Sequence, residues 1–114
     1  MTLSDRQAIF TINVAKLILL IQEQGYSCTF GEAYRTPEQA SWNAMRGSGV
    51  KNSLHCKRLA VDLNLFYKGE YLMDSSAHKP FGEWWEALHP DNRWGGRFHD
   101  GNHYSMMDGV TNTM

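Results

Sequence analysis

Hydrophobic positions in the first quarter of the chain follow the period of a helix. Four apolar residues recur at intervals of four, three and four, which places them on one helix face: Phe10, Val14, Leu17 and Ile21. Ser4 followed by Gln7 fits a capping box, and Gly25 is a typical residue just beyond a helix end. The pattern predicts a long amphipathic helix over residues 5–24.

An alternation of period two marks the strongest predicted strand, over residues 59–67. Val61, Leu63 and Leu65 share one face, and Asp62 lies on the opposite face. An acidic residue within an apolar strand needs a partner, because an unpaired buried carboxylate is costly. Asp62 therefore predicts a cation opposite it, either a metal ion or an arginine.

Shorter elements complete the prediction. The remaining strands are expected at 27–34, 70–73 and 103–107, and the remaining helices from Pro37 to about residue 46, with Thr36 as its N-cap, and at 82–89. The glycine-containing segments 47–53 and 93–102 are expected to be loops, and the tail after residue 109 is expected to fray. The order of elements predicts one α+β domain over residues 1–114, with a mostly antiparallel sheet and flanking helices.

Composition and charge narrow the classes of function. The 114 residues suffice for one domain, and 11 Lys and Arg against 12 Asp and Glu give a net charge of −1. That balance argues against a nucleic-acid binder that neutralises phosphates, and equally against a small nuclease. The apolar run at 9–21 is too short and too polar to span a bilayer, and no signal-peptide pattern surrounds it. We expect a monomer made in the cytoplasm, without membrane insertion, whose Cys28 and Cys56 are free thiols.

Two histidines and one aspartate have the residue types of a catalytic metal site. Six residues separate His55 from Asp62, and His103 follows Asp100 by three positions after an Asp-Gly turn. Three such ligands leave a fourth zinc position for water, the arrangement of catalytic zinc sites. Asp100 is placed to take the proton of that water. By spacing alone, these residues could equally be ordinary surface or core side chains.

Simpler roles are open to several other polar residues. Arg35 could form a surface ion pair, and Ser53 could be a loop serine. His99 stands four residues before His103, but the intervening glycine favours a turn over the helix that would bring both rings together. His78, in a polar segment before the third predicted helix, is expected to be exposed.

Four segments resemble the motifs of the LAS-type zinc peptidases, in the family order, from about residue 30 to residue 106. This family comprises D-Ala-D-Ala carboxypeptidases, vancomycin-resistance dipeptidases and L-alanyl-D-glutamate phage endolysins. The matching segments are the arginine segment Tyr34-Arg35-Thr36 with Gln39, the S-x-H-x6-D motif from Ser53-Leu54-His55 to Ala60-Val61-Asp62, the tract Trp94-Gly95-Gly96, and Asp100-Gly101-Asn102-His103.

The resemblance implies a hedgehog/D-Ala-D-Ala-peptidase-like fold and a zinc ion on His55, Asp62 and His103. It further implies that Asp100 acts as general base and then as general acid. Arg35 would hold a substrate carboxylate or the polarised carbonyl, and Ser53 would support the site or bind the peptide.

Two departures from the family pattern stand out. Arg58 occupies a position where the family usually has glycine, and Asp100 stands where the carboxypeptidase and dipeptidase branches have glutamate. Aspartate is the residue of the endolysin branch.

The resemblance therefore implies a zinc endolysin that hydrolyses the L-Ala–D-Glu bond of peptidoglycan stem peptides and lyses a phage host. Such an enzyme would be made in the host cytoplasm and reach the wall through a holin-type pore. The alternatives are a D-alanyl-D-alanine carboxypeptidase and an inactive zinc-containing binding module.

Overall fold

The computed structural model describes residues 1–47 and 53–110, so most of the loop expected at 47–53 and of the tail expected after residue 109 lies outside the described residues. The elements follow in this order: α1 (Leu3–Glu23), β1 (Tyr26–Phe30), α2 (Pro37–Met45), the 3₁₀ turn η1 (Leu54–Lys57), β2 (Ala60–Tyr67), β3 (Glu70–Leu72), η2 (Ser75–His78), α3 (Lys79–Leu88), β4 (Asn92–Trp94), η3 (Gly95–Phe98) and β5 (His103–Met106). The predicted α+β class is confirmed.

Helix α1 begins two residues earlier than predicted, because a different capping box forms. The Thr2 side chain accepts the Asp5 N–H at 3.0 Å, and the Asp5 carboxylate accepts the Thr2 N–H at 2.9 Å. These reciprocal bonds satisfy two helix-end donors and replace the expected pairing of Ser4 with Gln7. The predicted apolar face is buried as expected: Phe10, Val14, Leu17 and Ile21.

Strand β2 is the centre of an antiparallel sheet. One of its edges pairs with β1, and the other pairs with β5 along Ala60–Asp62 and with β3 along Leu65–Tyr67. Strand β4 pairs with the free edge of β5, which gives the order β1-β2-β5-β4. Strand β2 therefore contacts every other strand except β4.

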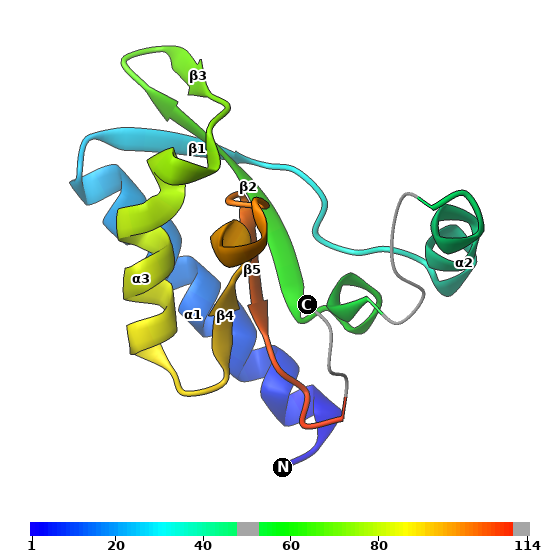
Figure 1. Cartoon of the computed structure of the whole chain (residues 1–114). Helices are drawn as coiled ribbons and strands as arrows, with labels where there is room; N and C mark the ends of the chain where they lie inside the picture. The colour runs from blue at the N-terminus through cyan, green and yellow to red at the C-terminus, as the bar shows by residue number, and fades with distance from the viewer. Residues whose placement is uncertain (48–52, 111–114) are drawn as a thin grey trace.

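Helices α1 and α3 cover the apolar face of this sheet. The two helices contact each other, and α1 also packs on β1 and β5 (Figure 1). Figure 1 shows α2 and η1 on the opposite side of β2 from these helices. The sheet contributes core-facing side chains from β2, β5 and β4: Val61, Leu63, Leu65, Tyr104, Met106 and Trp94. The opposite face of β2 is thus left for polar chemistry.

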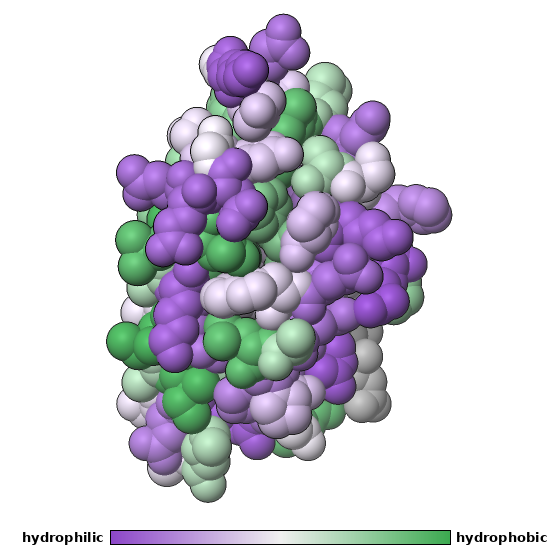
Figure 2. All heavy atoms as spheres, turned by 90° about the vertical axis from the view of Figure 1, so that its left-hand side faces the viewer, coloured by the Kyte–Doolittle hydropathy of each residue, from purple (hydrophilic) through white to green (hydrophobic). Residues whose placement is uncertain are grey.

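The surface seen from the side of the two large helices mixes hydrophilic and hydrophobic residues without a broad zone of either kind (Figure 2). None of the helices in the described ranges combines the length with the apolar character that crossing a bilayer requires.

Three predicted boundaries are wrong. Strand β1 ends at Phe30 rather than at residue 34, because the chain leaves the sheet toward α2. Helix α3 begins at Lys79 rather than at residue 82, with a proline in its first turn, where the missing N–H costs nothing. The segment 93–102, predicted as loop, contains the end of β4 and the turn η3. Strand β4 has only three residues, too few for a visible alternation.

The prediction that His78 is exposed is also wrong. Its side chain is only 3% exposed, and its Nδ1 lies 2.8 Å from the hydroxyl oxygen of Tyr104. Because α3 begins at Lys79, His78 lies directly at the helix start and is buried beside Tyr104. Burial lowers the pKa of His78 to about 4 and raises the pKa of Tyr104 above its usual value.

We expect His78 to make the fold sensitive to mild acid. Because the folded-state pKa lies below that of an unfolded histidine, the unfolded chain binds more protons between about pH 6.5 and pH 4, and stability falls as the pH drops through this range. Between pH 7 and pH 5, the free energy of unfolding of His78→Gln should fall by about 1–2 kcal/mol less than that of the wild type. Urea unfolding at both pH values, with a chelator present, measures this difference. Equal losses in both proteins would contradict it.

Candidate metal centre

Asp62 and His103 lie directly opposite each other on neighbouring strands. The register of β2 and β5 pairs Asp62 with His103. The Asp62 N–H and C=O both bond to the β1 side, to Glu32 and Gly31, at 2.8 Å each. On the β5 side the pair is therefore non-hydrogen-bonded, the type in which opposed side chains lie closest. The strand pairing alone brings a carboxylate and an imidazole together.

The turn η1 brings His55 to the same place. Ser53 is its N-cap, and the Ser53 side chain accepts the His55 N–H at 3.1 Å. The turn closes when the Leu59 N–H bonds to the Leu54 carbonyl at 3.0 Å, immediately before β2 begins. Ser53 is 2% exposed and His55 is 3% exposed. Ser53 thus contributes to the orientation of His55 through a hydrogen bond to its backbone.

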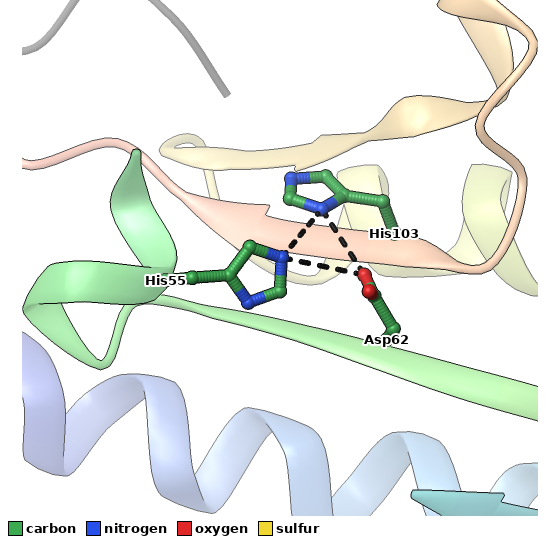
Figure 3. A group of neighbouring side chains, drawn as sticks. All are labelled: His55, Asp62 and His103. Carbon is green, nitrogen blue, oxygen red and sulfur yellow. Dashed lines mark hydrogen bonds and ion pairs between the residues drawn. The ribbon is translucent and has the colours of Figure 1, made fainter. Parts of the chain in front are cut away.

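The three predicted ligands converge on one point (Figure 3). His55 Nε2 lies 3.2 Å from His103 Nδ1 and 3.4 Å from Asp62 Oδ1, and His103 Nδ1 lies 3.3 Å from the same oxygen. Tetrahedral zinc, with bonds of about 2.0–2.1 Å to nitrogen and oxygen, separates its ligand atoms by roughly 3.3 Å. The triangle of side-chain atoms thus fits a metal ion of this size, with His55, Asp62 and His103 as its ligands.

The protonation of these groups also fits a metal centre. Burial alone raises the pKa of the Asp62 carboxyl, but the hydrogen bonds and charge of His103 and His55 outweigh it and lower the pKa to about 2. Asp62 is therefore ionised at neutral pH. If both rings present a lone pair to the shared point, their protons must sit on His55 Nδ1 and His103 Nε2. Both of these nitrogens are buried and lack a hydrogen-bond partner among the described residues.

Asp100 lies on the turn that leads into β5 and is exposed. Its carbonyl accepts the His103 N–H at 3.1 Å, and its own N–H donates to the Gly95 carbonyl at 2.9 Å. A Cβ on Gly95 would approach the Asp100 carbonyl oxygen to 2.4 Å, so a glycine is required there. The backbone therefore couples Asp100 to His103. The carboxylate of Asp100 is not part of the three-residue cluster, and His99, exposed nearby, lies outside it as expected.

Arg35 lies beside the cluster, but its guanidinium is already paired. It donates a hydrogen bond to the carboxylate of Glu32, and this bond raises the pKa of Arg35. Its backbone N–H donates to the His55 carbonyl at 3.2 Å. Glu32 also lies 3.5 Å from His55 Nδ1. Sequence reasoning missed Glu32, because three residues of spacing from Arg35 carry no motif and only the fold brings it to His55.

Arg58 has a backbone conformation that favours glycine. It ends η1 in the left-handed conformation, with φ of 54°, where a Cβ costs roughly 1–2 kcal/mol. The Arg58 guanidinium lies 4.0 Å from the centroid of the Tyr34 ring, a contact of a kind worth about 0.5–1 kcal/mol at an exposed site. Stacking on Tyr34 offsets part of the strain.

No family model matches the chain, and no curated protein matches it in sequence. Among solved structures, it is similar to the crystal structure of the Serratia marcescens L-Ala D-Glu endopeptidase ChiX, with a TM-score of 0.66. The match is 17% identical and covers 83% of this chain and 78% of ChiX. The chain therefore has the fold of this endopeptidase.

Proposed function

We propose that the chain is a zinc-dependent peptidoglycan peptidase that hydrolyses the L-Ala–D-Glu bond of cell-wall stem peptides. The observation that carries the proposal is the convergence of His55, Asp62 and His103 within 3.2–3.4 Å. The likeness of the fold to an L-Ala D-Glu endopeptidase supports the choice of reaction.

In this proposal each residue of the site has a separate task. A zinc ion held by the three ligands would supply a Lewis acid and a water of lowered pKa. Asp100 takes the proton of the attacking water and returns it to the leaving amine. Arg35 holds a substrate carboxylate or the polarised carbonyl. Ser53 keeps His55 in place through its bond to the His55 N–H.

The biological setting is part of the proposal. Aspartate rather than glutamate at position 100 supports the endolysin type of enzyme. We propose a phage lysis protein, made in the host cytoplasm, that meets the stem peptide in the periplasm after a holin-type protein opens the membrane. Because peptidoglycan is an extended polymer, only its stem peptide would enter the site.

Metal content tests the ligand set. The purified wild type should contain about one zinc ion per chain, and His55→Ala should retain little, because removal of one of three ligands leaves an incomplete site. His99→Ala is the matched control, since this exposed histidine lies near the turn but outside the cluster. Elemental analysis after dialysis measures the zinc. Equal zinc in wild type and His55→Ala would refute the assignment.

Removal of Asp100 should separate catalysis from metal binding. Asp100→Ala should lower the rate of stem-peptide hydrolysis by about 10²–10⁴-fold, because a general acid–base group is lost, while zinc content stays at the wild-type level. Asp74→Ala is the control, an exposed aspartate whose side chain caps no helix. Undiminished hydrolysis by Asp100→Ala would exclude the proposed mechanism.

The products of digestion identify the bond. Purified sacculi treated with the wild type should release stem peptides that begin with D-Glu, and mass spectrometry with end-group analysis detects them. Free D-Ala without soluble stem peptides would instead indicate a D,D-carboxypeptidase. Zinc binding with no product of either kind would indicate an inactive binding module.

A further inference from the structure

We infer that Glu32 is a positioning residue of the metal centre, which fixes the ring of His55 and the guanidinium of Arg35 through one carboxylate. The inference deepens the proposed function, since it rests on a metal ion at the same site. The starting observation is a buried ring nitrogen of His55 that lacks a hydrogen-bond partner within the described part of the chain. His55 Nδ1 must carry the ring proton if Nε2 faces the metal, and it has no hydrogen-bond partner among the described residues.

Main-chain hydrogen bonds fix the backbone of Glu32 beside Asp62. The Gly31 N–H donates to the Asp62 carbonyl, and the Asp62 N–H donates to the Glu32 carbonyl, both at 2.8 Å. A Cβ on Gly31 would lie 3.1 Å from the Asp62 Cβ, closer than most side chains approach each other. Glu32 is thus attached to a ligand residue by main-chain bonds, next to the site.

The same short segment is also attached to the second ligand residue. The Arg35 N–H donates to the His55 carbonyl at 3.2 Å. Residues 31–35 therefore bridge the backbones of Asp62 and His55, which holds the backbone of Glu32 close to both residues.

One oxygen of Glu32 faces both the Arg35 guanidinium and the His55 ring. Oε1 pairs with the Arg35 guanidinium and lies 3.5 Å from His55 Nδ1. A shift of about half an ångström would give an ordinary N–H···O bond. Metal-binding histidines usually donate their second ring N–H to a carboxylate or carbonyl, which fixes the tautomer and increases the basicity of the ligand. Glu32 supplies that acceptor for His55.

Zinc affinity tests the role independently of turnover. In competition with a chromophoric chelator, Glu32→Ala should bind zinc about 10–100-fold more weakly than the wild type. Glu32→Gln keeps an acceptor oxygen and should lose less. Glu38→Ala, which removes an exposed carboxylate from the first turn of α2, should bind zinc as the wild type does. The melting temperature of each zinc-free protein shows whether a loss of affinity merely reflects unfolding.

Ring ¹⁵N shifts of His55 in zinc-free protein supply a readout that a general structural role would not move. The wild type should show the proton on Nδ1, and Glu32→Ala should lose this preference while Glu32→Gln keeps it. Zinc affinity of Glu32→Ala within twofold of wild type, or an unchanged tautomer, would overturn the positioning role and leave the peptidase proposal intact if stem peptides are still released. Weakened affinity together with a wild type that releases no peptide would overturn the proposed function and leave the positioning role standing.

Discussion

The site depends on the pairing of Asp62 with His103 across β2 and β5. Adjacent residues of a strand point to opposite faces of the sheet. Val61 and Tyr104 therefore point into the core, and Asp62 and His103 point to the other face. A slip of one residue would exchange these faces, bury the carboxylate against α1 and α3, and expose the aromatic ring. The hydrophobic core therefore specifies the register, and the register brings Asp62 and His103 together.

The other edge of β2 holds the pair in place. Both backbone groups of Asp62 bond to Gly31 and Glu32, which leaves the His103 side free of main-chain bonds and brings the two side chains close. Beyond these bonds the chain runs from β1 to Arg35, whose N–H bonds to the His55 carbonyl in η1. The position of Asp62 in β2 thus places its own carboxylate, the imidazole of His103 opposite it and the charged segment beside His55.

Sequence patterns predicted much of this arrangement, and the misses have physical causes. The faces of α1 and β2 were predictable because burial on one side imposes a period on the apolar residues. The cluster of His55, Asp62 and His103 was predictable through a motif resemblance. Strand β4 was missed because three residues cannot show a period, and His78 was misplaced because its burial depends on where α3 begins. Glu32 was missed because its spacing from Arg35 carries no motif and because only the fold brings it to His55.

The sequence by itself determined the class of fold, the apolar face of each major element and the residue types available for metal chemistry, because these follow from local periodicity and side-chain character. Only the tertiary structure decided that the two histidines and Asp62 meet within 3.2–3.4 Å, that Arg35 is paired with Glu32, and that Arg58 adopts the left-handed conformation. The convergence of His55 and Asp62 with His103 arises from contacts between segments up to 48 residues apart, which no local pattern specifies.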